Sequence, residues 1–264
     1  MRVRIIGSGS SGNVLYIESG DTRVLVDVGL SARETARRLT EAGIDPSSID
    51  GIIVTHEHGD HARGVSVFAR SHDVPVYTTA ATREACQFGR FESKMRFAEV
   101  RSSESFQIGA IDFHPFTVPH DAVDSFAITI EANGTKVALV TDLGYITQLV
   151  CDRVRGADVL ILESNHDVEM LKICPHYPWS LKQRVLSKHG HLSNDHVATF
   201  LAEEFDGRAR HVVLAHLSKN TNHPEVARLA ALQALDQRGP LFSFDAERRV
   251  GIADPDGLSP WMNL

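Results

Sequence analysis

The stretch that most constrains this chain lies at positions 55–61, directly after a short apolar run at positions 51–54. That run is apolar and mostly β-branched, which is typical of a buried strand. Four residues that can bind a divalent metal follow it within six positions: His56, His58, Asp60 and His61. Neutral imidazole and carboxylate are groups that hold zinc, and also manganese or iron. The sequence therefore predicts a metal site at the carboxyl end of this strand.

The spacing of these four residues indicates two ions. In an extended turn, His56 and His58 can point the same way, so that both can bind one ion. The chain then turns at Gly59, which directs Asp60 and His61 toward a second point nearby. The alternative is a polar loop whose histidines only solvate the strand end, and a single histidine would favour that. Three histidines and an aspartate in this pattern favour the two-metal site.

A glycine-rich loop at positions 7–13 follows a predicted strand at 3–6 and fits the pattern G-x-G-x-x-G. A dinucleotide site of that kind requires a helix directly after the loop. Positions 14–18 are instead rich in β-branched and aromatic residues, which predict a strand. We therefore reject a dinucleotide site and expect the loop to join two strands.

Further ligand-type residues stand at strand ends later in the chain. Predicted strands at 111–118 and 136–140 are followed by His120 and Asp142, and a predicted strand at 211–218 carries His216 near its end. A carboxylate has two oxygens and can bridge two ions about 3.5–4 Å apart, so Asp142 is the candidate bridge. Asp27 ends the strand before the metal-bearing one, and it is either a supporting carboxylate or a turn-forming residue.

A predicted helix beginning after Ser193 could bind an anion, because the N-terminus of a helix attracts negative charge. His191 lies just ahead of this cap, placed to donate a proton, although an ordinary loop histidine is the alternative reading. Another predicted helix, at 180–188, carries three cations: Lys182, Arg184 and Lys188.

Composition is ordinary for a soluble globular protein, with 264 residues, 42% hydrophobic and 23% charged. No apolar run approaches the roughly 18–20 residues that span a bilayer, and the charged start does not fit a signal peptide. Three distant cysteines without a C-x-x-C pair predict no disulfide framework, so we expect a cytoplasmic protein. The net charge of −7 argues against a nucleic-acid partner. Two divalent ions would reduce it to about −3, and local patches matter more than the total.

The motif at positions 55–61 is the signature of the metallo-β-lactamase fold family, and the sequence resembles that family. Seven residues match its metal motifs in order: His56, His58, Asp60, His61, His120, Asp142 and His216. A closer resemblance is to the bacterial WalJ group of nuclease-like proteins, also called YycJ or VicX. The shared phrases lie at positions 7–13, 163–167, 177–184, 191–194 and 214–218.

The resemblance implies an α/β fold, a four-layer αββα sandwich of the metallo-β-lactamase type, with residues 1–264 as a single domain. It implies a phosphodiester hydrolase, a DNA exonuclease, in which a hydroxide shared by two zinc or manganese ions is the nucleophile. One ion would be held by His56, His58 and His120, and the other by Asp60, His61 and His216, with Asp142 as bridge. Asp60 would also orient the hydroxide, and His191 would protonate the departing oxygen.

Three functions stay open from the sequence. The first is a nuclease acting on DNA or RNA. The second is a small-molecule hydrolase of the same fold, acting on a cyclic phosphodiester or a thioester. The third is a regulatory protein that binds a partner and whose metal site is vestigial, and the complete set of ligands argues against it. Aspartate at position 142, where true β-lactamases of this fold carry cysteine, argues against a β-lactamase.

Overall fold

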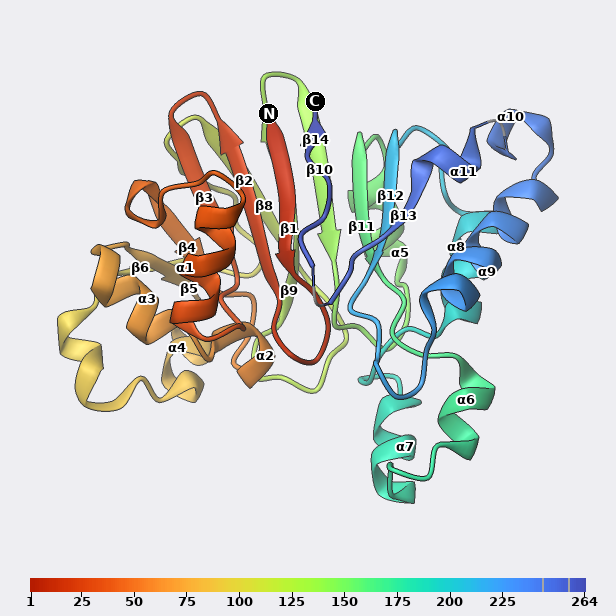
Figure 1. Ribbon diagram of the computed structural model, residues 1–264, viewed down its shortest axis with the longest axis horizontal. Helices are drawn as coiled ribbons and strands as arrows, with labels where there is room; N and C mark the ends of the chain where they lie inside the picture. Colours follow the sequence, from red (N-terminus) through yellow and green to blue (C-terminus); the bar gives the residue numbers. More distant parts are fainter. Residues whose placement is uncertain (244, 256) are drawn as a thin grey trace. The chain divides into compact units, whose positions relative to one another are not determined.

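Figure 1 shows the computed structural model, which describes residues 1–243, 245–255 and 257–264. Its strands form two mixed sheets flanked by helices. This confirms the predicted α/β class and αββα type of fold. The chain divides into two compact units: residues 1–117, 122–135 and 254–264 form the first, and residues 118–121 and 136–253 form the second. That residues 1–264 make a single domain stays a prediction.

One of the two sheets lies entirely in the first unit, and its strand order is β14-β1-β2-β3-β4-β5-β6. Its strands are β1 (Arg2–Gly7), β2 (Val14–Ser19), β3 (Thr22–Val26), β4 (Gly51–Ile53), β5 (Val76–Thr78), β6 (Phe97–Glu99) and β14 (Met262–Asn263). Strands β3 to β6 are parallel, whereas β14, β1, β2 and β3 pair antiparallel. The glycine-rich loop joins β1 to β2, as expected.

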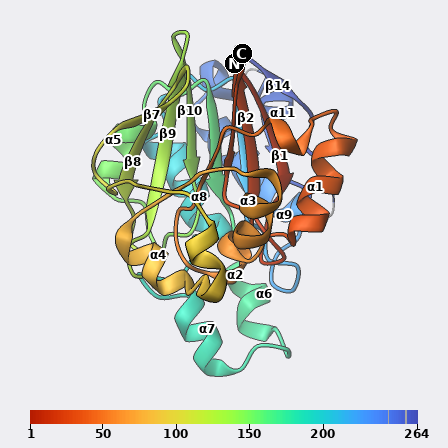
Figure 2. The ribbon, with the colours of Figure 1, turned by 90° about the vertical axis from the view of Figure 1, so that its left-hand side faces the viewer.

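Helices cover one face of this sheet. They are α1 (Ala32–Glu41), α2 (Gly59–Ala62), α3 (Val65–His72) and α4 (Ala80–Cys86), with 3-10 turns at Pro46–Ser48 and Gly89–Lys94. Figure 2 shows α1 and α3 in front of β1 and β2. Leu39 of α1 and Phe68 of α3 are fully buried in one hydrophobic cluster with Ile52 of β4. Burying each such side chain contributes about 1.5–3 kcal/mol, so this cluster anchors the helices to the sheet.

The first unit also contains an antiparallel group of strands: β7 (Phe106–Ile108), β8 (Ile111–Thr117) and β9 (Phe126–Ala132). After β9 the chain turns through Asn133 and Gly134, both with positive φ, as a two-residue Asn-Gly hairpin turn requires.

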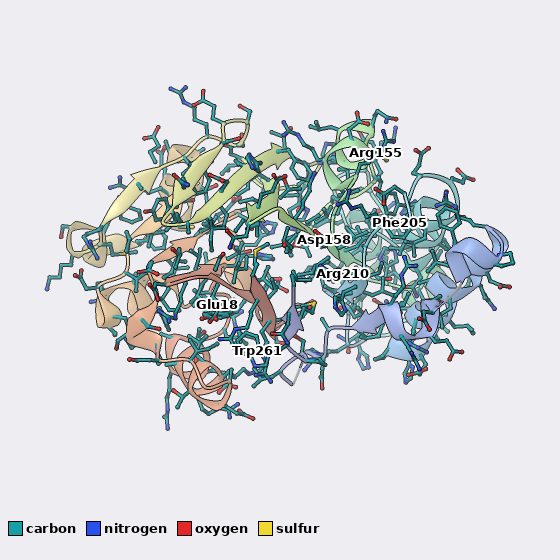
Figure 3. All side chains as sticks on the ribbon, turned by 90° about the horizontal axis from the view of Figure 1, so that it is seen from above. Glu18, Arg155, Asp158, Phe205, Arg210 and Trp261 are labelled. Atoms are coloured by element: carbon teal, nitrogen blue, oxygen red, sulfur yellow. The ribbon has the colours of Figure 1, made fainter. Side chains whose placement is uncertain are left out.

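The second unit contains four parallel strands: β10 (Thr135–Val140), β11 (Val159–Glu163), β12 (His211–Ala215) and β13 (Val250–Ile252). At their amino ends, Asp158 accepts a hydrogen bond from the Lys136 amide at 3.0 Å and pairs with Arg210 at 3.6 Å (Figure 3). The carboxyl ends of parallel strands meet at one edge. This brings together Asp142, which follows β10, Glu163, which ends β11, and His216, which follows β12.

The helices of the second unit are α5 (Gln148–Val154), α6 (Val168–Ile173), α7 (Trp179–Val185), α8 (Asn194–Glu203), α9 (Pro224–Gln237), α10 (Pro240–Ser243) and α11 (Ala246–Arg249). Helix α7 ends three residues before the predicted end at Lys188. From position 241 the sequence indicates one or two short strands and a tail; β13 and β14 lie there, but the sequence does not indicate the helices α10 and α11. Single-turn helices leave no periodic pattern, and tertiary bonds hold α11, such as the one from Arg249 to the Gly207 carbonyl at 2.8 Å. Among the described residues, no helix has the length and apolar character needed to cross a membrane.

Candidate metal centre

Asp27, directly after β3, supports the loop that follows β4. Its Oδ2 accepts a hydrogen bond from His61 Nδ1 at 2.7 Å, and its oxygens also accept from the Thr55 amide and hydroxyl at 2.9 Å. In this tautomer His61 Nδ1 carries the proton, and Nε2 keeps the lone pair with which histidine binds a metal. Because β3 and β4 are parallel, their carboxyl ends lie together. Of the two roles left open by the sequence, Asp27 has the supporting one.

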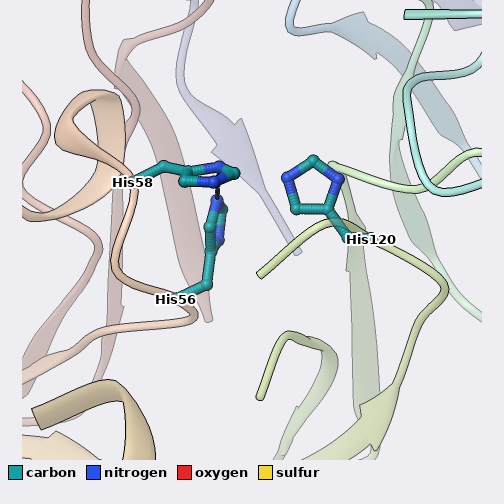
Figure 4. A group of neighbouring side chains, drawn as sticks. All are labelled: His56, His58 and His120. Carbon is teal, nitrogen blue, oxygen red and sulfur yellow. Dashed lines mark hydrogen bonds between the residues drawn. The ribbon is translucent and has the colours of Figure 1, made fainter. Parts of the chain in front are cut away.

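His56 and His58 place two imidazole nitrogens close together at the start of the loop (Figure 4). His56 Nε2 lies 3.2 Å from His58 Nδ1, with the ring planes at 80°. Two nitrogens that bind one zinc ion at about 2.0–2.1 Å in tetrahedral geometry are about 3.3 Å apart. This pair therefore has the separation that two ligands of one ion require.

Asn13, at the end of the glycine-rich loop, contacts the other two predicted ligands of this unit, Asp60 and His61. Its Oδ1 accepts a hydrogen bond from the Gly9 amide at 2.8 Å, which turns Nδ2 toward His61 Nε2 at 3.0 Å. Nδ2 also lies 3.2 Å from the Asp60 carbonyl oxygen. Sequence reasoning missed Asn13. The available signal was the polar residue that closes the glycine-rich loop.

Glu163, the last residue of β11, is the centre of a polar cluster in the second unit. Its Oε1 accepts hydrogen bonds from Nδ1 of His191 at 2.8 Å and Nδ1 of His216 at 2.7 Å. Its Oε2 accepts from the amides of Leu143 and Leu192 at 3.2 and 3.0 Å. The carboxylate is fully buried, and both oxygens are hydrogen-bonded. Sequence reasoning assigned Glu163 no role, although a carboxylate that ends an apolar strand was a signal.

In this cluster, Glu163 and His191 each stabilise the charged form of the other. Burial alone raises the pKa of Glu163, but the charge and hydrogen bond of His191, with the hydrogen bond of His216, outweigh burial and lower that pKa to about 2. Burial lowers the pKa of His191, but the Glu163 carboxylate raises it above the usual value. Glu163 is therefore ionised at neutral pH, and its charge favours a protonated His191.

His120 lies beside this cluster. Its Nδ1 donates a hydrogen bond to the Gly190 carbonyl at 3.2 Å, and its Nε2 lies 4.0 Å from Asp142 Oδ1. Four residues of the second unit offer possible ligand atoms within 4.8 Å of one another: Asp142, Glu163, His191 and His216.

The first unit likewise brings together His56, His58, Asp60 and His61. The predicted ligands thus divide between the units, and imidazole with carboxylate is the donor set of a divalent metal site.

Comparison with known proteins identifies the family to which the chain belongs. Residues 22–217 match the β-lactamase superfamily domain. The chain belongs to the β-lactamase superfamily. It is 38% identical over 259 residues to Exodeoxyribonuclease YycJ of Bacillus anthracis, covering 97% of this chain and 96% of the relative. Exodeoxyribonuclease WalJ of Streptococcus pneumoniae is 36% identical over 261 residues, covering 97% and 95%. The predicted resemblance is confirmed.

A solved structure shows the same fold. The crystal structure of YhfI from Bacillus subtilis, a metallo-β-lactamase fold protein, has a TM-score of 0.73 to this chain. The two are 19% identical, and the match covers 98% of this chain and 99% of YhfI.

His166, in the second unit, is expected to make the free energy of unfolding depend on pH. It is buried, and in the part of the chain that the structure describes neither ring nitrogen has a hydrogen-bond partner. Burial lowers its pKa to about 4. His166 therefore binds a proton more readily in the unfolded chain than in the folded one. The free energy of unfolding falls as the pH drops from about 6.5 to 4, and it does not change on account of His166 above pH 6.5.

Between pH 7 and pH 5, the free energy of unfolding of the wild-type protein should fall by about 2 kcal/mol more than that of His166→Leu. Urea unfolding of metal-free protein at the two pH values measures this. His176→Leu, at an exposed position, should keep the wild-type pH dependence. An unchanged pH dependence in His166→Leu would contradict the assignment.

Proposed function

We propose that this chain is a metal-dependent phosphodiester hydrolase, an exodeoxyribonuclease acting on DNA. Similarity to two exodeoxyribonucleases along nearly the full length of each chain carries the proposal. The imidazole and carboxylate clusters of the two units support it, because such donors suit the divalent ions that many phosphodiesterases use. A cytoplasmic location, expected from the cysteines, stays a prediction.

We infer two bound ions, zinc or manganese. Seven residues would hold them: His56, His58 and His120 on one ion, Asp60, His61 and His216 on the other, and Asp142 on both. When bound, divalent ions neutralise negative charge on a phosphate and lower the pKa of water. The 3.2 Å separation of the nitrogens of His56 and His58 supports this assignment.

The chain's own residues would position the water and move the proton. Asp60 would orient the attacking water through its carboxylate. Glu163 accepts the Nδ1 proton of His191, so the second proton of the imidazolium is on Nε2, and this is the proton that His191 would give to the departing oxygen. The Glu163 carboxylate also raises the pKa of His191, which favours the protonated form that a general acid needs.

His191→Ala is expected to slow DNA hydrolysis about 10²–10⁴-fold, because a general acid typically contributes that much. The metal content should stay at the wild-type level. Steady-state kinetics and elemental analysis of the same preparation measure both. Loss of metal in this variant would contradict the proposal that His191 is a general acid and not a metal ligand.

Digestion of end-labelled DNA and RNA, single- and double-stranded, by protein reconstituted with zinc or manganese tests the function. Stepwise shortening of DNA from one end supports the proposal, and the ladder gives the polarity. No cleavage of any nucleic acid by protein loaded with metal would overturn it. Hydrolysis of small phosphodiesters alone would then assign the site to a small-molecule hydrolase.

A further inference from the structure

The helical hairpin at residues 168–189 has no role in the chemistry above. It consists of α6 and α7, joined by residues 174–178. Figures 1 and 2 both show the two helices side by side, beyond the carboxyl ends of the strands of the second unit. Of the nine large hydrophobic side chains that are exposed among the described residues, three belong to this hairpin: Ile173, Trp179 and Leu186.

The charge of this hairpin is opposite to that of the rest of the chain. Residues 168–189 contain four cations and one carboxylate, a formal charge of +3, whereas the whole chain carries −7. The remainder of the chain therefore carries −10. Three of the cations are exposed: Lys172, Arg184 and Lys188. A basic segment in an acidic protein marks a surface for a polyanion.

Trp179 is 65% exposed at the first position of α7, a helix that is anchored to the rest of the hairpin. The ammonium of Lys182, a largely buried residue, donates to the Lys172 carbonyl at 2.7 Å and ties α7 to α6. Leu171 of α6 and Val185 of α7 are buried beneath. The exposed indole therefore projects from a helix that is packed and hydrogen-bonded into the hairpin.

The hairpin is joined directly to the cluster around Glu163. The His191 amide donates to the Val185 carbonyl at 3.0 Å, so the end of α7 holds the proposed general acid. Arg184 pairs with Asp121, the neighbour of His120. A strand bound along this hairpin would therefore lead toward the residues proposed to act on it.

We propose that the α6–α7 hairpin is a docking surface for single-stranded DNA, in which a base stacks on Trp179 and phosphates lie against Arg184 and Lys188. This rests on the proposed function and adds to it a place that holds the strand. Single-stranded DNA fits because an exposed indole can stack on a base that is not paired, and nearby cations follow the backbone. In a duplex, the faces of the bases are already stacked.

Tryptophan fluorescence tests the surface without catalysis. The chain contains two tryptophans, so Trp261→Phe leaves Trp179 as the reporter. Titration of metal-free protein with oligothymidylate should quench its emission. Unchanged emission would overturn the proposal and point to a protein partner for the exposed apolar residues. Should Trp261→Phe fail to fold, the anisotropy of labelled oligothymidylate with the wild-type chain replaces this measurement.

Trp179→Ala should weaken binding of oligothymidylate at least about fivefold, the lower end of what one stacked base contributes. Lys188→Gln should reduce the dependence of log affinity on log salt by about 0.7, the amount for one phosphate contact on a single strand. The matched controls are Leu229→Ala, at a 56% exposed leucine of α9, and Arg155→Gln, at an exposed arginine after α5. Neither control should change the affinity.

A small chromogenic phosphodiester separates this proposal from the proposed function. Trp179→Ala should hydrolyse it at the wild-type rate, because the compound is too small to reach the hairpin. Binding of oligothymidylate through Trp179 by a chain that cleaves no phosphodiester would refute the nuclease and leave the docking surface standing. Wild-type affinity in Trp179→Ala, or equally tight Trp179-dependent binding of a duplex, would overturn the docking surface even in an active nuclease.

Discussion

Asp60→Asn is expected to lower the rate of DNA hydrolysis by at least about 10²–10³-fold, the loss typical of removing one group that stabilises charge in the transition state. The substitution keeps the shape of the side chain and removes its charge. A neutral amide is a poor ligand for a divalent ion and cannot accept a proton from water. Rates on labelled single-stranded DNA and the metal content of the protein measure the effect.

The fold should survive this substitution. The shorter contacts between Asp60 and the glycine-rich loop use its main chain, whose carbonyl accepts from the Asn13 amide at 2.8 Å, and the carboxylate accepts only a long hydrogen bond from Asn13 Nδ2 at 3.5 Å, which an amide oxygen can also accept. We therefore expect an unchanged midpoint of thermal unfolding for the metal-free protein. Asp112→Asn, at an exposed position of β8, is the matched control and should keep full activity. Wild-type hydrolysis by Asp60→Asn would remove Asp60 from the mechanism.

Gly29→Ala is expected to destroy the metal-binding loop of the first unit. A β-carbon at position 29 would lie 1.6 Å from the Asp60 carbonyl oxygen and 2.7 Å from the Asn13 amide nitrogen. Both are backbone atoms, so no side-chain rotation relieves the overlap. The loop carrying Asp60 and His61 must move away from Asn13, which breaks the contacts that orient those two ligands.

We expect a loss of about 3 kcal/mol or more in the free energy of unfolding, at or above the upper end of the usual cost of overpacking. Bound metal should fall with it. Urea unfolding and elemental analysis of Gly29→Ala measure the two effects. Gly251→Ala is the control, because a β-carbon there would have no described heavy atom within 4 Å. Native stability with full metal content in Gly29→Ala would show that the close contact is not needed.

The sequence alone indicated the fold and the candidate donors because the patterns for both are local in the chain. A short apolar strand followed by His56, His58, Asp60 and His61 is readable without knowing what the strand packs against. The same logic placed His120, Asp142 and His216 at strand ends. Parallel strands deliver their carboxyl ends to one edge, so strand-end residues are already candidates for a common site.

Only the tertiary structure decided how these donors are supported. Asn13 reaches His61 because the glycine-rich loop folds back over α2, and Glu163 joins His191 to His216 because three separate segments meet there. Hydrogen bonds between residues far apart in the chain leave no periodic signal in the sequence. The exposure of Trp179 also depends on the tertiary structure, since only the packing of α7 shows which of its side chains are buried. Local pattern thus indicated which residues are candidate donors, and long-range packing decided which residues hydrogen-bond to them and which side chains stay exposed.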